Sequence, residues 1–208
     1  MNRKEHWEAI YKSKSPAGVS WYQQKPTISL ELIALCSLST ADYVIDVGGG
    51  ASTLCDYLLE RGYEHLTVLD LSANALEHSK QRLGNNASLI EWQVEDVTKF
   101  SALRYYDIWH DRAVFHFLTD ESDRKKYKDV LNASVKVGGH VIIAAFSIGG
   151  PTKCSGLNII QYDETKLKTE LGKNFTLVEQ RTEEHITPGG NAQIFGYYLF
   201  TKVIGTKD

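Results

Sequence analysis

The sequence predicts one doubly wound α/β domain, in which helices cover both faces of a mostly parallel sheet. Short apolar runs alternate with helix-like stretches as far as about residue 147. Such alternation requires right-handed crossovers, and it therefore places successive strands parallel to one another. The chain has 208 residues, enough for one well-buried core and too few for two of comfortable size. We expect a single domain over residues 1–208, with its sheet between residues 41 and 203.

Seven apolar runs have the length and composition of buried strands. In chain order they are Tyr43–Val47, Leu66–Leu69, Leu89–Val94, Tyr106–Trp109, Val141–Phe146, Phe175–Val178 and Ile194–Val203. Glycine commonly ends a helix, and serine is a preferred N-cap. The predicted helices are Leu54–Arg61, which Gly62 closes, Ala73–Leu83, which lies between Ser72 and Gly84, and Asp120–Val137, which Gly138 and Gly139 close.

The two ends of the chain differ from this alternating pattern. Near the end, the runs Phe175–Thr187 and Asn191–Val203 flank a Pro-Gly-Gly sequence with no helix between them, which predicts an antiparallel hairpin at the sheet edge. Before the first strand, residues 1–40 are rich in aromatic side chains: Trp7, Tyr11, Trp21 and Tyr22. We expect these residues to form a helical flap over the sheet. Ordinary core packing is an equally good interpretation of their aromatic rings.

Composition excludes several classes of partner. The net charge is −3 and basic residues occur only in short runs, which disfavours nucleic acid. No apolar stretch approaches the roughly 20 residues of a membrane span, so we expect a soluble, cytoplasmic protein without a membrane partner. Cys36, Cys55 and Cys154 lack disulfide or metal-ligand spacing, and we predict neither a disulfide nor a metal site. Cys36 and Cys55 are expected in the core, and Cys154 in a more exposed position.

A carboxylate precedes a glycine loop in Val44–Thr53, whose sequence is VIDVGGGAST. Glycines at the end of a first parallel strand allow a ligand to approach the backbone closely. Asp46 would repel a pyrophosphate there, at a cost of about 4 kcal/mol per charge pair at about 4 Å and an effective dielectric constant near 20. Thr53 also replaces the third glycine of a dinucleotide-binding loop. The loop therefore favours a positively charged ligand such as S-adenosylmethionine over NAD.

The same stretch resembles motif I of the class I S-adenosylmethionine-dependent methyltransferases, usually D/E-x-G-x-G-x-G. This sequence supplies Asp46, Gly48 and Gly50, and Ser52 stands in the place of the last glycine. The resemblance covers about residues 40–203. It implies S-adenosylmethionine as the cofactor and a Rossmann-like seven-stranded sheet in the order 3-2-1-4-5-7-6, in which the last strand is antiparallel.

Acids also follow the second and third predicted strands. Asp70 stands 24 residues after Asp46, close to the spacing at which a carboxylate accepts both ribose hydroxyls, although it could also serve the start of the next helix. The resemblance implies that Asp96 binds the adenine amino group and that the Val97 amide meets the ring. The complete predicted cofactor site is Asp46, Gly48, Gly49, Gly50, Ser52, Asp70, Leu71, Glu95, Asp96, Val97, Asp111 and Trp21.

The candidate catalytic residues follow the fourth predicted strand, in the sequence WHDRAVFHFLTD. His110, Asp111 and His116 are candidates there, and by analogy with the family this segment faces both cofactor and acceptor. A histidine with a near-neutral pKa could take a proton from the acceptor, although a lone histidine is more often a structural hydrogen-bonding group. We prefer Asp111 as a residue near the cofactor. The loop from Ser147 to Gly156, which contains Cys154, is either a substrate lid or a plain connector.

The leading prediction is therefore a methyltransferase that acts on a small metabolite or on a protein side chain. Two alternatives remain at this level. One is an NAD-type oxidoreductase on a similar sheet, and the other is a module that binds the cofactor without transferring its methyl group. The sequence leaves the acceptor, the use of a general base and the oligomeric state open.

Overall fold

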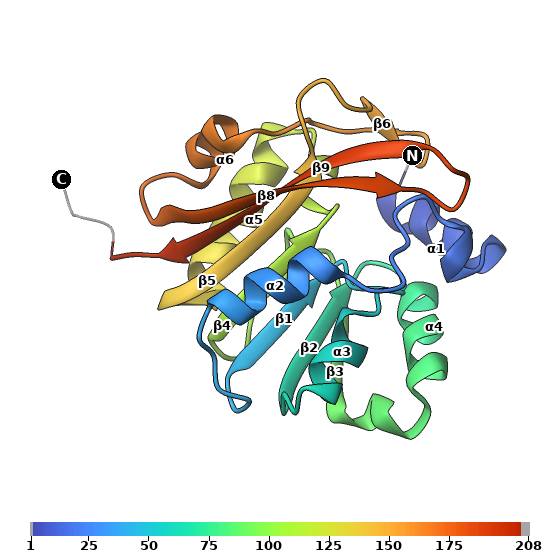
Figure 1. Ribbon diagram of the computed structural model, residues 1–208, viewed down its shortest axis with the longest axis horizontal. Helices are drawn as coiled ribbons and strands as arrows, with labels where there is room; N and C mark the ends of the chain where they lie inside the picture. Colours follow the sequence, from blue (N-terminus) through green and yellow to red (C-terminus); the bar gives the residue numbers. More distant parts are fainter. Residues whose placement is uncertain (1, 205–208) are drawn as a thin grey trace.

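The computed structural model describes residues 2–204, which form a seven-stranded sheet flanked by helices (Figure 1). The strand order is β3-β2-β1-β4-β5-β9-β8, which confirms the predicted order once the two short strands β6 and β7 are counted. The strand β9 is antiparallel to both of its neighbours, as expected. The strands are β1 (Tyr43–Val47), β2 (His65–Asp70), β3 (Ile90–Val94), β4 (Tyr106–Arg112), β5 (Val135–Phe146), β8 (Phe175–Ile186) and β9 (Ala192–Lys202).

The helices fill the connections between these strands. They are α1 (Arg3–Ser13), α2 (Thr27–Leu35), α3 (Leu54–Glu60), α4 (Ala73–Leu83), α5 (Glu121–Ser134) and α6 (Glu164–Leu171), with short 3₁₀ turns η1 (Pro16–Gly18), η2 (Gly84–Leu89) and η3 (Phe115–Phe117). The strands β6 (Lys153–Cys154) and β7 (Leu157–Asn158) form a separate small hairpin. The Ser72 hydroxyl accepts a hydrogen bond from the Ala75 amide, so the predicted N-cap of α4 is confirmed.

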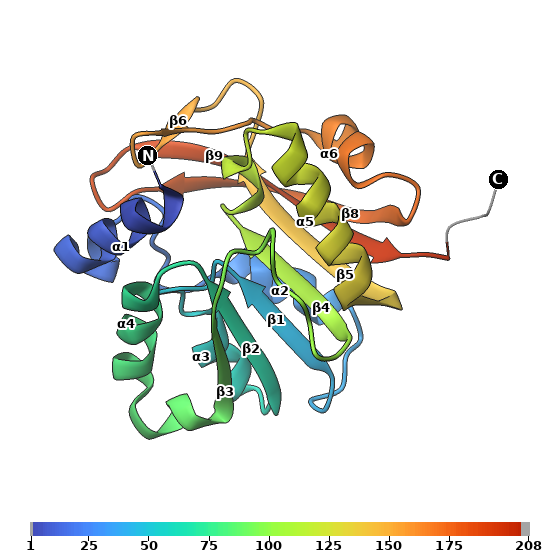
Figure 2. The same ribbon diagram turned by 180° about the vertical axis from the view of Figure 1, so that it is seen from behind.

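Alternating side chains of the strands divide the interior into two cores. On β1, Val44 packs on the face that α2 and α3 cover, whereas Ile45 packs on the face that α5 and α6 cover. On β4, Ile108 and Trp109 divide in the same way. Figure 1 shows α2 in front of the sheet, and Figure 2 shows α5 in front of the opposite face. The period-2 alternation of strands thus fixes which side of the sheet each strand-end residue can reach.

The N-terminal segment is only partly a flap. The helix α1 lies beside α4 at one end of the sheet, as a flap would (Figure 1). In contrast, α2 buries Leu30, Leu32 and Ile33 in the core, with none of these side chains more than 1% exposed. The region 27–35 is therefore part of the core rather than of a flap.

Two local predictions were wrong. The helix expected over Asp120–Val137 ends at Ser134, and the extended backbone of β5 begins at Val135. Gly138 and Gly139 lie where the pairing of β5 with β4 shifts register, so these glycines mark an irregularity in a strand rather than the end of a helix. Cys154 is buried rather than exposed, whereas Cys36 and Cys55 lie in the core as expected.

Three negative findings apply to residues 2–204. No helix there is long and apolar enough to cross a membrane. The same residues contain no group of three or more histidine, cysteine, aspartate or glutamate side chains arranged to hold a metal ion. All three cysteines are free thiols in this structure.

Candidate active site

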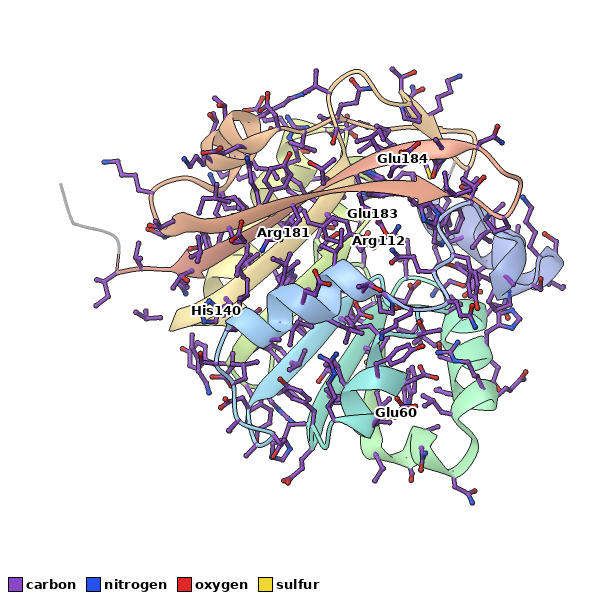
Figure 3. All side chains as sticks on the ribbon, viewed as in Figure 1. Glu60, Arg112, His140, Arg181, Glu183 and Glu184 are labelled. Atoms are coloured by element: carbon purple, nitrogen blue, oxygen red, sulfur yellow. The ribbon has the colours of Figure 1, made fainter. Side chains whose placement is uncertain are left out.

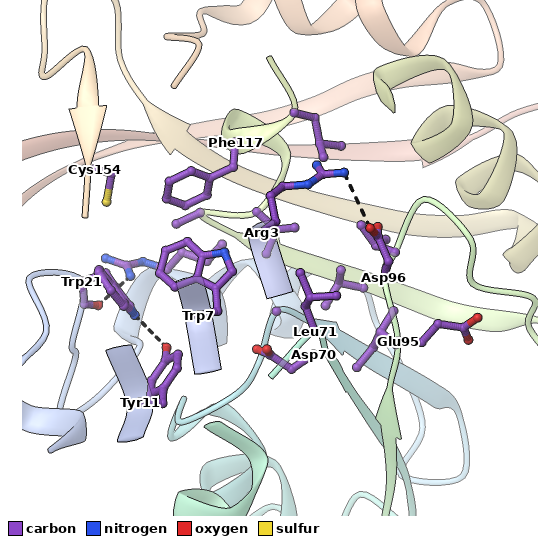
Figure 4. A pocket seen from close by; sticks show the side chains of 18 residues that line it. Arg3, Trp7, Tyr11, Trp21, Asp70, Leu71, Glu95, Asp96, Phe117 and Cys154 are labelled. Atoms are coloured by element: carbon purple, nitrogen blue, oxygen red, sulfur yellow. Dashed lines mark hydrogen bonds and ion pairs between the residues drawn. The ribbon is translucent and has the colours of Figure 1, made fainter. Parts of the chain in front are cut away.

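A deep pocket lies at the carboxyl ends of β1 to β4, where an open α/β sheet binds its ligands. It contains about 780 Å³ of space between atoms, its open mouth included. A second cavity beside it shares Tyr11, Trp21, Gly48 and Arg112 with the first. Of the predicted cofactor residues, Trp21, Gly48, Asp70, Leu71, Glu95, Asp96 and Val97 line the pocket (Figure 4), and Trp21, Asp46, Gly48, Gly49 and Ser52 line the second cavity.

The glycine loop passes directly over two carboxylates. A Cβ atom on Gly49 would lie 2.6 Å from Asp46 Oδ2, and a Cβ atom on Gly50 would lie 2.6 Å from Asp70 Oδ2. Gly48 has a φ of +67°, and a Cβ atom there would collide with Val114. Larger residues would displace the carboxylates or the loop itself. The three consecutive glycines therefore place an acid at the mouth of the loop without steric conflict.

Asp46 is buried with only one of its two oxygens partnered. The His110 ring donates from Nδ1 to Asp46 Oδ1 over 2.7 Å, and the Ser29 hydroxyl lies 2.8 Å from His110 Nε2. Asp46 Oδ2 has no hydrogen-bond partner among the described residues. Buried polar atoms in folded proteins are normally paired, so this oxygen is available for a ligand. An ammonium group fits both its charge and its need for a donor.

Asp70 ends β2 and lies between the glycine loop and α4. The Ser72 amide donates to Asp70 Oδ1 over 2.8 Å. The pKa of Asp70 is raised to about 7, mainly by burial and also by the negative charges of Asp46 and Glu8, while hydrogen bonds from the Ser72 and Gly50 amides oppose the shift. An ionised Asp70 can accept from two neighbouring hydroxyl groups, as a ribose presents them.

Asp96 lies at the far side of the pocket from the aromatic wall (Figure 4). Its Oδ1 accepts from the amide and the hydroxyl of Thr98, at 2.9 and 2.8 Å, which forms a turn after β3. Its Oδ2 lies 3.6 Å from Arg3 Nη2. Glu95 is exposed and its carboxylate points away from the aromatic rings (Figure 4). Asp96 is thus held in place by the turn and keeps one oxygen near the pocket.

One face of α1 forms a wall of the pocket that the sequence did not reveal in full. Arg3, Trp7 and Tyr11 line the pocket and are spaced four residues apart, which places them on one helix face. Glu8 anchors α1 from another face, because its carboxylate accepts from the Ser72 hydroxyl and from the amides of Ala73 and Asn74. The start of α4 thus binds α1 over the pocket.

Aromatic rings from three segments meet in this wall (Figure 4). The Trp7 ring centroid lies 5.5 Å from that of Trp21 and 5.0 Å from that of Phe117, both in edge-to-face geometry. The Trp21 indole donates to the Tyr11 hydroxyl over 3.1 Å. Cys154 completes this side of the pocket from the β6–β7 hairpin. This part of the pocket is therefore apolar and suited to exclude water.

Asp111 and His116, which the sequence predicts at the site, line neither cavity. Asp111 is fully buried on the α5 side, where its carboxylate accepts from the Val114 and Phe115 amides and from the Tyr127 hydroxyl. Burial raises its pKa to about 6. His116 is also fully buried, and burial lowers its pKa to about 3. Asp111 thus holds the turn after β4, whereas His116 accepts a hydrogen bond from the Phe146 amide of β5 through Nδ1.

His110 does line the second cavity, but its geometry does not suit a general base. Its side chain is 3% exposed, and both ring nitrogens are engaged, by Asp46 and by Ser29. A base must reach the proton that it removes. The catalytic role predicted for His110 is therefore not supported, and its contacts place it behind Asp46.

Arg112 is the basic side chain that lines both cavities. Its Nε donates to the Tyr197 hydroxyl over 2.7 Å, and its Nη1 donates to the Trp21 carbonyl over 2.8 Å. Its Nη2 lies 3.5 Å from Glu183 Oε2 but makes no hydrogen bond within residues 2–204. Figure 3 shows Arg112 beside Glu183 under the β8–β9 pair. A buried guanidinium with a free donor suits a carboxylate ligand.

Comparison with known proteins also indicates a methyltransferase. The family described as "Methyltransferase domain" matches residues 44–139. The chain is 23% identical to "EEF1A lysine methyltransferase 2" of Homo sapiens, over 92% of this chain and 82% of that protein.

Two solved structures share the fold. A SAM-dependent methyltransferase from Anabaena variabilis has a TM-score of 0.75 at 14% identity, over 97% of this chain and 96% of that one. The N-methyltransferase NodS from Bradyrhizobium japonicum, solved with S-adenosyl-L-homocysteine, has a TM-score of 0.64 at 21% identity, over 86% of this chain and 89% of that one. The strand order, the glycine loop with its acid and the family match together support a class I S-adenosylmethionine-dependent methyltransferase.

Proposed function

We propose that the protein transfers the methyl group of S-adenosylmethionine to a small molecule that is enclosed beneath α1. The observation that carries this proposal is the wall of Trp7, Trp21 and Phe117, which closes the pocket beside the strand ends. An acceptor in this position is surrounded by aromatic surface and removed from water. The family match favours methyl transfer over the NAD-type oxidoreductase and over a module that only binds the cofactor.

The residues present fit the cofactor. Asp70 would accept the ribose hydroxyls, and Asp96 with the Val97 amide would bind the adenine. The unpartnered Asp46 Oδ2 would receive the ammonium group of the methionine portion, and Arg112 Nη2 would receive its carboxylate. Two buried polar atoms of opposite charge, both without hydrogen bonds inside the described chain, support this assignment of the zwitterionic end.

When bound, S-adenosylmethionine supplies a methyl group that its sulfonium already activates for in-line displacement. The chain's own contribution is alignment and exclusion of water. Trp7, Trp21 and Phe117 exclude solvent from the acceptor. Burial raises the pKa of Cys154 to about 11 and that of Tyr11 still higher, so both keep their protons at neutral pH. We therefore propose no general base, and the acceptor must present an unprotonated nucleophile.

A protein lysine side chain is the second candidate acceptor. The observation in its favour is the likeness to a protein named as an EEF1A lysine methyltransferase, which extends over most of both chains. A lysine would reach the same aromatic wall through the mouth of the pocket, and its ammonium would have to lose a proton before transfer.

Labelled cofactor separates the two acceptors. The protein is incubated with methyl-labelled S-adenosylmethionine and with host extract divided into small molecules and macromolecules. We expect label in the small-molecule fraction, and none with the Asp70→Ala variant. Label that enters protein supports lysine instead, and label in neither fraction contradicts methyl transfer under these conditions.

Three predictions from the sequence stay predictions. These are the cytoplasmic location, the absence of a nucleic-acid or membrane partner, and the organisation of residues 1–208 as one domain. The net charge of −3 supports the second of them.

A further inference from the structure

We infer that His110 and Ser29 are positioning residues, which hold the Asp46 carboxylate ready for the ammonium group of the cofactor. This inference deepens the proposed function and rests on it. Ser29 of α2, His110 of β4 and Asp46 of β1 form a continuous chain of hydrogen bonds, with distances of 2.8 and 2.7 Å. Each of the three side chains is at least nine-tenths buried. A chain of this kind connects a helix on the sheet face to the mouth of the glycine loop.

The hydrogen bonds from Ser29 through His110 to Asp46 fix the orientation of the Asp46 carboxylate. His110 and Asp46 occupy paired positions on neighbouring strands, so the imidazole lies directly beside the carboxylate. Because both ring nitrogens are engaged, the imidazole cannot rotate without breaking a buried hydrogen bond. The bond to Oδ1 consequently determines where Oδ2 points.

Asp46 Oδ2 points toward the glycine loop. It is the atom that a side chain on Gly49 would meet, and it has no hydrogen-bond partner in the part of the chain that the structure describes. Both Gly49 and Arg112 line the second cavity together with Asp46 and His110. Asp46 itself lines this cavity, and Oδ2 is its one carboxylate oxygen that the described residues leave without a partner. His110 thus holds one oxygen of the carboxylate, and the other is left for the ligand.

Two nucleoside probes isolate this end of the cofactor. S-adenosylhomocysteine carries the amino-acid group, whereas 5′-methylthioadenosine has the same adenosine and thioether without it. Their dissociation constants are measured by isothermal titration calorimetry on the wild type, His110→Leu, His110→Asn and Ser29→Ala. Asparagine places an amide donor near the position of Nδ1, and leucine removes the donor. The His140→Asn variant serves as a control, because His140 bonds Thr201 on β9 and lines neither cavity.

We expect His110→Leu to weaken the affinity for S-adenosylhomocysteine by about tenfold and to change the affinity for 5′-methylthioadenosine by no more than about twofold. His110→Asn should restore most of the affinity for S-adenosylhomocysteine, and Ser29→Ala should cause a smaller loss of about threefold. The control should match the wild type. Thermal unfolding without ligand establishes that each variant is folded.

Three results would overturn the inference. In the first, His110→Leu weakens both probes equally, which would mean that His110 only supports the pocket as a whole. In the second, no variant changes the ratio of the two affinities. In the third, asparagine and leucine behave alike, which would make the donor to Asp46 irrelevant. If the wild type binds neither probe, the proposed cofactor site fails and the inference fails with it.

Discussion

Two aspartates on neighbouring strands, Asp46 of β1 and Asp111 of β4, are buried to nearly the same degree on opposite faces of one sheet. They are 3% and 0% exposed. Asp111 accepts hydrogen bonds from two backbone amides and a tyrosine hydroxyl, whereas Asp46 accepts from one histidine and has an oxygen without a partner. Asp46 lines a cavity and Asp111 does not.

The difference shows that burial does not by itself identify a functional carboxylate. Asp111 has its hydrogen-bonding capacity filled by the chain, and it therefore stabilises the turn between β4 and η3. One oxygen of Asp46 has no partner within the described residues, and because Asp46 lines a cavity we propose that a ligand provides that partner. Accounting for the partners of each oxygen separates a structural acid from a binding acid, where charge, burial and position in the sequence do not.

Replacement of the structural acid should have the largest effect. We expect Asp111→Ala to lower the free energy of unfolding by about 3–4 kcal/mol, because two amides and the Tyr127 hydroxyl lose a charged acceptor in the core. Urea denaturation followed by circular dichroism measures the change. A variant of normal stability that has lost S-adenosylhomocysteine binding would instead place Asp111 in the ligand site.

Replacement of the binding acid should affect ligand rather than fold. Asp46→Asn keeps the shape and removes the charge, so we expect the affinity for S-adenosylhomocysteine to fall about 30-fold, equivalent to about 2 kcal/mol. The free energy of unfolding should change by less than about 1 kcal/mol, because a buried charge is removed together with one of its interactions. Calorimetric titration and urea denaturation test the two halves of this prediction. Loss of stability without loss of affinity would mean that Asp46, like Asp111, has a structural role and does not bind the ligand.

The contribution of Asp70 to the stability of the folded state should depend on pH. Its pKa in the folded protein is about 7, against an ordinary value of 3.8, so the folded state retains a proton that the unfolded state releases. This contribution to stability is complete below about pH 4 and is lost as the pH rises to about 7. Across that window, we expect the stability of Asp70→Asn to rise relative to the wild type.

The affinity for the ligand should increase with pH, whereas the contribution of Asp70 to stability decreases. If only the ionised carboxylate accepts the ribose hydroxyls, the affinity for S-adenosylhomocysteine should rise about tenfold between pH 6 and pH 8. Titrations at several pH values, with Asp70→Asn as the control of constant charge, measure this. A flat profile for the wild type would show that the ionisation of Asp70 does not govern binding.

Replacement of Glu8 should have the smallest effect, because its carboxylate lines neither cavity and acts only by holding α1 against α4. Glu8→Gln removes the negative charge from the start of α4, where helix amides favour an anion. We expect a loss of about 1 kcal/mol in unfolding free energy and of about twofold in affinity for S-adenosylhomocysteine. A larger loss of affinity than of stability would show that the docking of α1 mainly serves the ligand.

Much of the fold could be predicted because its signals are local. Glycines and acids at successive strand ends gave the pocket and most of its predicted residues. Val135 to Gly139 were assigned wrongly because a glycine pair looks the same at the end of a helix and in an irregular strand. Val135 and His140 pair with β4 on either side of this irregularity, and such pairing is a tertiary contact.

The distinction between His110, Asp111 and His116 could not be read from the chain. Adjacent residues of a strand point to opposite faces, so an error of one position in an element moves a side chain from a cavity to the core. His110 and Asp111 follow each other on β4 and serve different faces. Arg3 and Trp7 could have been found, because their spacing from Tyr11 matches one face of a helix.

The position of α1 has a practical consequence for handling the protein. Arg3 borders the pocket beside Asp96, whereas β9 finishes at Lys202, near the level of His140 at the opposite end of the strands (Figure 3). An affinity tag fused ahead of α1 would crowd the opening through which nucleosides must pass. Purification handles and surface attachments therefore belong after β9, where they leave that opening clear.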